Sequence, residues 1–310
     1  MNERVLELRR ELQKIIRGKQ EITDRILMAI LARGHILLED VPGVGKTTTA
    51  LGFSKLMGMS FQRVQFTPDV VPSDITGFTV YDRTSESFRY HPGAVMCNLL
   101  LADEINRTSS KTQAALLEVM EEGKVTVDGV THDLPSPFVV IATQNPIGSA
   151  GTQKLPESQL DRFMVKLSMG YPDAVSQKEL LRDRQERNPL EEAPQVLNTD
   201  IVTQIQEQVR RVYVADSILE YITQLTQATR NRESIALGIS PRGALALCRM
   251  AKAAAYLDNR DYVTPEDVQL VFCDVCAHRL VLCTRARFQE TTPSDILREI
   301  LKETPQPKVG

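Results

Sequence analysis

The sequence predicts an α/β domain with a central parallel sheet and two β-hairpin insertions, followed by an all-helical domain. Three observations support this prediction. Over residues 1–172, short apolar runs alternate with helical patterns, which is typical of a parallel sheet. Two segments in that range alternate polar and apolar residues around a polar turn. Over residues 173–310, apolar residues recur at helical spacing, so we expect a second, helical domain there.

The N-terminus predicts two amphipathic helices. Apolar residues recur at intervals of three and four from Val5 to Ile16 and again from Ile22 to Ile30. This segment is charged, unlike a secretory signal, and no stretch approaches the roughly 18 uninterrupted apolar residues that a membrane span needs. We therefore expect a cytoplasmic protein without a membrane span.

Five short apolar runs are the predicted strands. The first, "HILLED", lies between Gly34 and the turn "DVPG", and its continuous apolar character suits a strand buried on both faces. The other four runs are "FQRVQFT", "NLLLAD", "FVVIATQ" and "FMVKLSM". The predicted hairpins are "FTVYDRTSESFRY" and "KVTVDGVTHDL", the second with Asp128 and Gly129 at its tip.

The turn "DVPGVGKTT", residues 40–48, joins the first strand to a helix. Glycine lets the backbone curl around a phosphate, and the N–H groups of a helix N-terminus attract anions. Lys46 can reach the β and γ phosphates of a nucleotide, and Thr47 can bind Mg²⁺. Asp40 replaces the usual first glycine of such a loop, and aspartate also tolerates turn conformations. The predicted nucleotide contacts are Asp40, Pro42, Gly43, Val44, Gly45, Lys46, Thr47 and Thr48.

Polar side chains follow two of the other predicted strands. "NLLLADEINR" contains Asp103, placed to hold Mg²⁺ directly or through water, and Glu104, placed to polarise an attacking water. This pair indicates hydrolysis. "FVVIATQNP" contains Asn145, whose amide can hydrogen-bond both the water and the γ phosphate, although an ordinary Asn-Pro turn is the alternative. Taken singly, Arg162 in "LPESQLDRF" and Arg242 in "ISPRGALAL" fit surface charges equally well.

Charge and cysteine content narrow the choice of partners. The formal net charge of −3 gives no global basic field, so duplex nucleic acid is not indicated.

Cys273, Cys276, His278 and Cys283 lie close together in "FCDVCAHRLVLC" and allow a metal or redox role. The apolar residues of that stretch keep helical spacing, which favours thiols packed as small buried hydrophobes.

The ordered set of motifs resembles the AAA+ ATPases and, within them, the MoxR family. The resemblance covers nearly the whole chain, and that family tolerates Asp40 in the phosphate loop. The motifs that carry it are "LLEDVPGVGKT", "FTPDVVPSDITG", "LLLADEINR", "ATQNP", "LPESQLDRF", "GYP" and "SPRG".

The resemblance implies a role for each motif residue. Lys46 and Thr47 are implied to be the Walker A pair, Asp103 and Glu104 the Walker B pair, Asn145 sensor 1, Arg162 the arginine finger and Arg242 sensor 2. As sensor 2, Arg242 is expected to reach back from the helical domain to ATP held by the other domain of its own chain. It also implies an insert in helix 2 at about 75–95, a hairpin before sensor 1 at about 124–136, and a hexameric ring that hydrolyses ATP with Mg²⁺. Arg33 and Arg107 stay open, because Arg107 fits a contact to a neighbouring subunit and a local salt bridge equally well.

Family members are thought to be chaperone-like remodellers, often with von Willebrand factor A domain partners that carry a metal site. We therefore expect a protein substrate, with a magnesium-chelatase-like motor subunit as one alternative and a nucleic-acid motor or loader as another. The basic residues of the second predicted hairpin are Lys124 and His132. Asp128 and Asp133 lie beside them, so the hairpin lacks a dense comb of cations for gripping phosphates. Nucleic acid is the weaker alternative.

Overall fold

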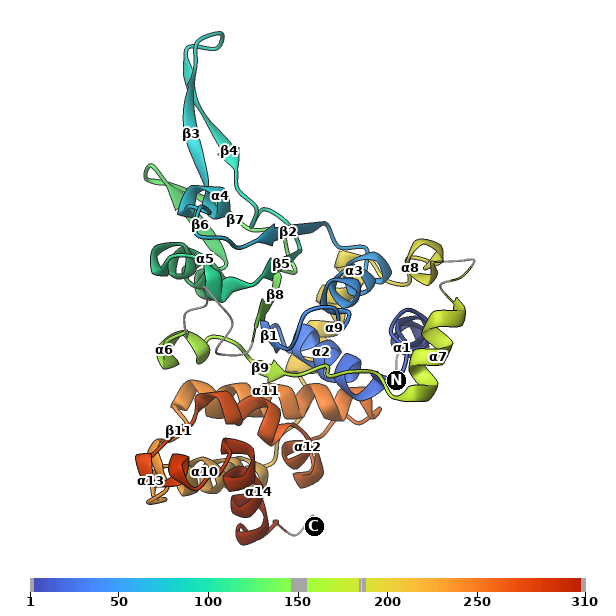
Figure 1. Ribbon diagram of the computed structural model, residues 1–310, viewed down its shortest axis with the longest axis vertical. Helices are drawn as coiled ribbons and strands as arrows, with labels where there is room; N and C mark the ends of the chain where they lie inside the picture. Colours follow the sequence, from blue (N-terminus) through green and yellow to red (C-terminus); the bar gives the residue numbers. More distant parts are fainter. Residues whose placement is uncertain (1–2, 146–154, 184, 186–187, 308–310) are drawn as a thin grey trace.

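The computed structural model describes residues 3–145, 155–183, 185 and 188–307, so Pro146 of the "ATQNP" motif lies outside the described residues. Its large domain contains a five-stranded sheet in the order β2-β5-β8-β1-β9 (Figure 1). All paired strands of this sheet run parallel. The strands are β1 (Ile36–Glu39), β2 (Phe61–Gln65), β5 (Leu99–Asp103), β8 (Val139–Gln144) and β9 (Val165–Leu167). All five apolar runs are strands, so the predicted sheet is confirmed.

The strand order brings the motif residues to one edge of the sheet. Parallel strands end at the same edge, and β8 lies between β5 and β1. In the register, Gln65 pairs with Asp103, and Glu39 pairs with Gln144. The segments that follow β1, β5 and β8 therefore leave the sheet side by side, which is where ligands bind in open α/β sheets.

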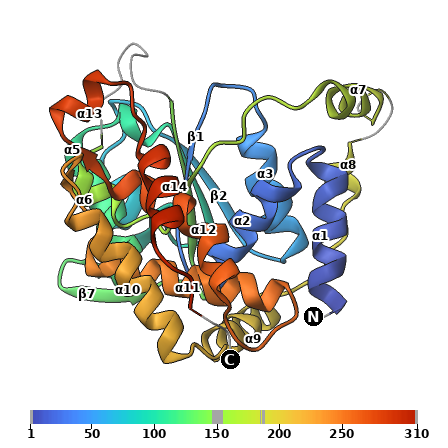
Figure 2. The ribbon, with the colours of Figure 1, turned by 90° about the horizontal axis from the view of Figure 1, so that it is seen from below.

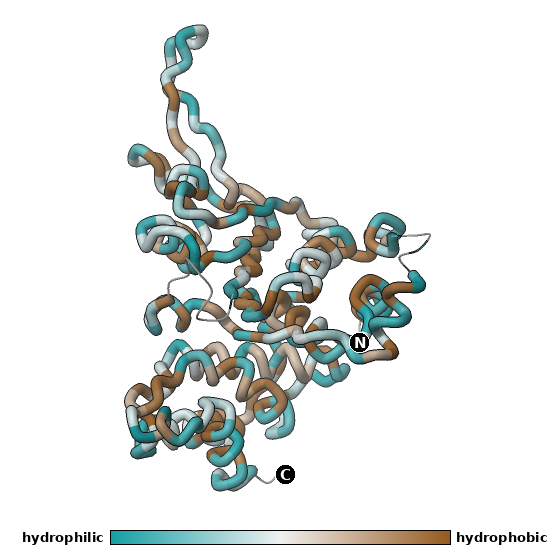
Figure 3. The backbone as a smooth tube through the Cα atoms, in the orientation of Figure 1, coloured by the Kyte–Doolittle hydropathy of each residue, from teal (hydrophilic) through white to brown (hydrophobic). Residues whose placement is uncertain are grey.

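Helices cover both faces of the sheet, and Figure 2 shows α1, α2 and α3 on one side of the strands and α5 and α6 on the other. Alternate strand residues point to opposite faces. Leu38 and Leu101 are buried in one core cluster with α1–α3, whereas Leu37 and Leu100 are buried in the other with α5. Figure 3 shows the resulting apolar band through the middle of the large domain. These helices are α1 (Glu3–Ile15), α2 (Gln20–Leu31), α3 (Lys46–Leu56), α5 (Ser110–Glu122) and α6 (Glu157–Leu160).

Two antiparallel hairpins project from this domain, as predicted, and the longer one forms the tip at the top of Figure 1. It follows the short helix α4 (Pro72–Thr76). The rings of Tyr90 and His132 stack with centroids 3.9 Å apart and so link the two hairpins. The hairpin strands are β3 (Gly77–Asp82), β4 (Ser87–Pro92), β6 (Lys124–Val127) and β7 (Val130–Asp133).

The C-terminal part is helical. Its later helices, from residue 216 onward, lie at the end of the molecule opposite the long hairpin, whereas its first three helices lie beside α1, α2 and α3 (Figure 1). Its helices, after α7 (Ala174–Asp183) and α8 (Pro189–Glu192), are α9 (Thr199–Arg210), α10 (Asp216–Arg230), α11 (Pro241–Leu257), α12 (Pro265–Cys276), α13 (Thr284–Phe288) and α14 (Pro293–Glu303). Short 3-10 helices span Ile105–Arg107 (η1) and Ala277–Arg279 (η2). A small antiparallel ladder of β10 (Ile235–Leu237) and β11 (Val281–Leu282) was not predicted, because such short strands carry no readable alternation. The domain boundary at residue 172 stays a prediction.

The cysteines of α12 and the segment after it pack as the helical pattern predicts. Cys276 is fully buried in the core, and Cys273 and Cys283 pack against the same cluster. All five cysteines of the chain are free. In the described part of the chain, no group of three or more His, Cys, Asp or Glu side chains is arranged to hold a metal ion. Among the same described residues, no helix is long and apolar enough to cross a bilayer.

Candidate nucleotide-binding site

The loop between β1 and α3 is shaped by two glycines in the left-handed region. Gly43 has φ of 86° and Gly45 has φ of 97°. A Cβ atom at Gly43 would meet nothing within 4 Å, so backbone conformation, not space, favours glycine there. Gly45 is the N-cap of α3, and the free N–H groups of the first helical turn carry positive partial charge. The loop is therefore built to hold an anion.

Lys46 lies at the start of α3 with its side chain folded over this loop. Its Nζ donates hydrogen bonds to the carbonyl oxygens of Asp40 at 2.7 Å and Val41 at 3.4 Å. The residue is only 8% exposed, and this burial lowers the pKa of Lys46. The carboxylates of Asp40, Asp103 and Glu104 act in the opposite direction and favour the charged form. The amino group thus sits in a partly dry, acidic site in which it can pair with phosphate.

Asp40, at the position of the usual first glycine, turns its carboxylate away from the nucleotide pocket. The carboxylate accepts hydrogen bonds from the backbone N–H groups of Met169 and Gly170, the latter at 3.2 Å. It also accepts one from the hydroxyl of Ser168 at 3.1 Å. Asp40 therefore ties the phosphate loop to the segment that follows β9, a function that glycine has no side chain to perform.

Asp103, at the end of β5, is held by two neighbouring strands. Thr143 of β8 donates to its Oδ1 at 2.6 Å, and Arg63 of β2 donates to its Oδ2 at 2.7 Å. Asp103 is 9% exposed, so these bonds fix the direction of a nearly buried carboxylate. Hydrogen bonds of this kind commonly orient carboxylates that bind a metal ion.

Glu104 follows Asp103 in the left-handed conformation, with φ of 58°. This conformation is uncommon for a residue with a long side chain, and it occurs in turns and at functional sites. Asn145 donates to Glu104 Oε1 at 2.8 Å, and Arg107 donates to Oε2 at 2.8 Å. The hydrogen bond from Arg107 is the main reason that the pKa of Glu104 lies below its ordinary value. Of the two readings left open for Arg107, the structure shows the local salt bridge.

These motifs line one cavity of about 410 Å³. That volume lies within the roughly 300–1,000 Å³ of typical small-molecule sites. The lining residues are Pro42, Gly43, Gly45, Lys46, Thr47, Thr48, Arg63, Gln65, Asp103, Glu104 and Asn145. Asp40 and Val44, two of the predicted nucleotide contacts, are not among them.

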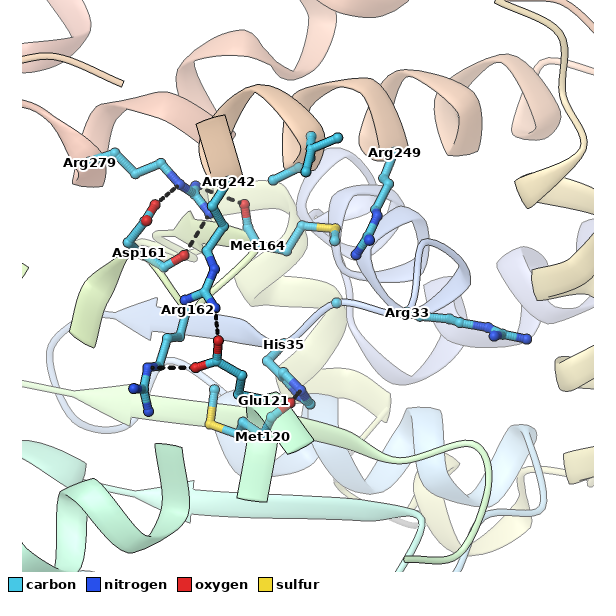
Figure 4. A pocket seen from close by; sticks show the side chains of 13 residues that line it. Arg33, His35, Met120, Glu121, Asp161, Arg162, Met164, Arg242, Arg249 and Arg279 are labelled. Atoms are coloured by element: carbon cyan, nitrogen blue, oxygen red, sulfur yellow. Dashed lines mark hydrogen bonds and ion pairs between the residues drawn. The ribbon is translucent and has the colours of Figure 1, made fainter. Parts of the chain in front are cut away.

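Arg162 and Arg242 lie elsewhere. Both line a second cavity between the large domain and α11, and Figure 4 shows both pointing toward Glu121. Arg162 forms an ion pair with Glu121 at 3.3 Å, and Arg242 pairs with the other oxygen of the same carboxylate. Neither arginine lines the cavity of the phosphate loop. Arg242, expected to reach the ATP of its own large domain, instead pairs with Glu121 in the second cavity.

Comparison with known proteins identifies the family. The model of the "ATPase family associated with various cellular activities (AAA)" matches residues 35–165, and that of an "AAA lid domain" matches residues 227–300. The chain is 40% identical to "Chaperone MoxR1" of Mycobacterium tuberculosis, over 97% of this chain and 81% of that protein. It is 30% identical to "Protein MoxR" of Methylorubrum extorquens, over 96% of this chain and 94% of the relative. The chain belongs to the MoxR family of AAA+ ATPases.

Two further relatives extend this match. The MoxR-family chain is 47% identical to "Uncharacterized protein YeaC" of Bacillus subtilis, over 96% of this chain and 92% of that one. A crystal structure of a candidate ATPase from Cytophaga hutchinsonii superposes with a TM-score of 0.92 at 37% identity, covering 99% of this chain and 96% of the other. Membership of this ATPase family supports nucleotide binding and ATP hydrolysis as the general activity.

Three further residues hold the predicted site residues in place, and no sequence motif predicted this role for them. Arg63 and Thr143 hold Asp103, and Glu121 pairs with both Arg162 and Arg242. Arg63 interrupts a predicted strand with a charge, which is a weak signal of a polar site at that strand. Thr143 and Glu121 carry no signal of this kind, since their partners are distant in the sequence.

Proposed function

We propose that this MoxR-family ATPase binds ATP with Mg²⁺ in the cavity of the phosphate loop and uses its hydrolysis to remodel or mature a partner protein in the cytoplasm. One observation carries the proposal: a phosphate loop, a fixed carboxylate, a second carboxylate and an amide share one cavity at the ends of three parallel strands. The name of the relative "Chaperone MoxR1" supports a protein as the substrate.

Binding uses the phosphate loop and two oxygen ligands. The N-terminus of α3 and the amino group of Lys46 hold the phosphates. The Thr47 hydroxyl and the Asp103 carboxylate line the same cavity, and they fit Mg²⁺, which takes oxygen ligands from one or two side chains together with substrate phosphates and water. Bound there, Mg²⁺ would offset negative charge on the phosphates.

Hydrolysis is assigned to Glu104 and Asn145. Glu104 accepts a proton from water as the water oxygen bonds to the γ phosphorus and the bond to the leaving oxygen of ADP breaks. Its lowered pKa keeps the carboxylate ionised near neutral pH. Asn145 already contacts Glu104 and can orient the water with the same amide.

Arg162 and Arg242 act in a neighbouring subunit in this proposal. Both lie outside the cavity that holds their own subunit's phosphate loop, so the site that we propose for them is that of another copy. A ring of subunits, which we propose to be a hexamer, supplies that arrangement. A closed ring gives every site one arginine donor.

The partner is proposed to be a protein, with a von Willebrand factor A domain protein as one candidate. A magnesium-chelatase-like role is the second candidate, favoured by 28% identity to a "Magnesium-chelatase subunit ChlI homolog" of Methanocaldococcus jannaschii over 66% of this chain and 54% of that protein. The higher identity and coverage of the chaperone relative support protein remodelling as the leading proposal.

A substrate trap tests the proposal. Glu104→Gln keeps the size of the side chain but removes the base, so it should bind ATP and lose about a hundredfold or more in turnover. With ATP it should retain a protein partner on affinity capture from its own lysate, while Lys46→Ala retains none. Turnover of Glu104→Gln within about twofold of wild type would overturn the assigned role of Glu104, and equal capture by both variants would overturn ATP-dependent remodelling.

A further inference from the structure

The cavity between the large domain and α11 concentrates positive charge. Its volume is about 490 Å³. The charged residues that line it are Arg33, Arg162, Arg242, Arg249 and Arg279, with Glu121 and Asp161 as the acids. His35 adds no charge at neutral pH, because burial lowers the pKa of its ring to about 4. The cavity is therefore suited to an anion.

One acid in this cavity belongs to a fixed contact between the two domains. The side chain of Arg279 is 2% exposed and donates to Asp161 Oδ1 at 2.8 Å. It also donates to the carbonyl oxygen of Phe163 at 2.6 Å. Ser240 donates to the other oxygen of Asp161 at 2.9 Å, so each oxygen of this carboxylate has a partner and its charge is paired with that of Arg279.

The other acid, Glu121, belongs to an exchangeable contact. Its carboxylate receives Arg162 from the segment after α6 and Arg242 from the first turn of α11 (Figure 4). The side chains of Glu121, Arg162 and Arg242 are 37%, 31% and 42% exposed. Ion pairs this open to water are screened and weak, so a phosphate with more charge and more oxygens can displace the carboxylate.

The position of Glu121 in its own helix gives no stability reason for an acid. It lies in the last turn of α5, and that turn, which ends at Glu122, contains no basic residue. Acids near a helix C-terminus are disfavoured by the helix dipole. Its favourable contacts in the described structure are the two arginines from outside the helix.

One further cation faces the same cavity. Arg249 lies two turns along α11 from Arg242 and lines the cavity, with no hydrogen bond or ion pair to another described residue. Arg33 differs, because it points away from these side chains in Figure 4 and pairs with Glu207 at 2.6 Å. Glu121 thus pairs with Arg162 and Arg242, while Arg249 lines the same cavity without a carboxylate partner among the described residues.

We propose that Glu121 is a positioning residue that takes the place of a phosphate. In the free subunit it holds Arg162 and Arg242 side by side, and in the ring the terminal phosphates of the neighbour's ATP replace it. This inference rests on the proposed function, in which these arginines act on a neighbouring site. Glu121 then competes with the neighbour's ATP and sets the subunit concentration at which the ring closes.

The test compares Glu121→Gln with Glu122→Gln. The control removes the same charge from the adjacent residue, which is exposed and does not line the cavity. Sedimentation velocity with ATPγS gives the subunit concentration of half-assembly. It should be about fivefold lower for Glu121→Gln, the factor expected for the loss of two weak, exposed ion pairs, and unchanged for Glu122→Gln. Glu121→Asp, which keeps the charge, should stay near wild type. Equal midpoints for the two Gln variants would overturn the inference.

A second arm separates this inference from the proposed function. In an Arg162→Ala, Arg242→Ala background, Glu121→Gln should no longer shift the midpoint, because the arginines through which it acts are gone. A shift that persists there overturns the inference. Full ATP turnover by Arg162→Ala alone would instead overturn the trans role of Arg162. If Arg162→Ala is inactive but Glu121→Gln and Glu122→Gln assemble at the same subunit concentration, the role of Glu121 is overturned and the trans role of Arg162 stands.

Discussion

The side-chain amide of Asn145 lies 2.8 Å from Oε1 of Glu104, so the segments after β8 and β5 meet at one carboxylate. The second oxygen of that carboxylate is held by Arg107 at 2.8 Å. The proposed base is thus positioned by a neutral donor on one side and a cationic donor on the other. Both donors lower the pKa of Glu104, and Arg107 lowers it more than Asn145 does, so the pH dependence of activity can report on the contact with Arg107.

Arg107→Ala should move the acid limb of the pH profile of kcat to higher pH. Arg107 lowers the pKa of Glu104, so its removal raises that pKa toward the ordinary value. A base works only when ionised, and activity is lost as pH falls through its pKa. The limb should therefore appear at a higher pH in the variant, whereas Arg107→Lys, which keeps the charge, should stay close to wild type. An unmoved limb in Arg107→Ala would show that Glu104 is not the titrating group.

Lys46→Ala should weaken ATP binding severely. It deletes the amino group that lies buried over the phosphate loop within hydrogen-bond distance of two of the loop's carbonyl oxygens. Lys55→Ala is the matched control, because it removes the same charge from the last turn of α3 and does not line the nucleotide cavity. Titration calorimetry with ATP compares the two. Equal affinities would contradict the assignment of the loop.

Asp40→Ala should destabilise the fold by about 1–3 kcal/mol, because it removes the hydrogen-bond acceptor of the buried N–H group of Met169 and of two partly buried donors. The groups left without this partner are the N–H groups of Met169 and Gly170 and the hydroxyl of Ser168. Asp69→Ala serves as the control, since Asp69 is exposed and has no hydrogen bond or ion pair to another described residue. Urea unfolding measures the difference. A free energy of unfolding that falls equally in both variants would show that the tie to the segment after β9 is unimportant.

The part of the fold that the sequence predicted is the part encoded by local pattern. Strands buried on both faces, such as β1 and β5, must be continuous apolar runs, and a phosphate loop needs its glycines and lysine at fixed spacing. The resemblance to the MoxR family rests on the order of these motifs along the chain and implies a role for each of them. Together they located the sheet, the hairpins and the candidate residues Lys46, Asp103 and Glu104.

The remainder depends on contacts between distant segments. The two partners of Glu121 come from another loop and from the helical domain, so no window of sequence contains the pair. Asp40 departs from the glycine that the phosphate-loop pattern expects at that position. Its role depends on the pairing of β9 with β1, which brings the N–H group of Met169 to its carboxylate. Such pairs are decided by tertiary packing, which single-sequence periodicity does not report.

Mixing two inactive proteins tests whether Arg162 serves a neighbouring site. Arg162→Ala should bind ATP nearly as wild type, because Arg162 does not line its own subunit's nucleotide cavity, and should hydrolyse it poorly. The loss should be large, since arginine fingers are worth about 10³ to 10⁵ in rate where they have been measured in GTPases. Glu104→Gln should be inactive for a different reason, because its own site lacks the base while its arginine is intact.

A mixed ring then contains interfaces at which an intact Glu104 site of one subunit receives an intact Arg162 from the next. Random mixing in equal amounts makes about a quarter of the interfaces complete in a closed ring. Phosphate release should therefore recover to a corresponding fraction of wild type. Fluorescently labelled subunits report exchange, and the double variant Arg162→Ala, Glu104→Gln mixed with Arg162→Ala serves as the control, because no intact arginine is present. If exchange occurs and activity stays at the level of this control, Arg162 does not act in trans, and its ion pair with Glu121 is structural.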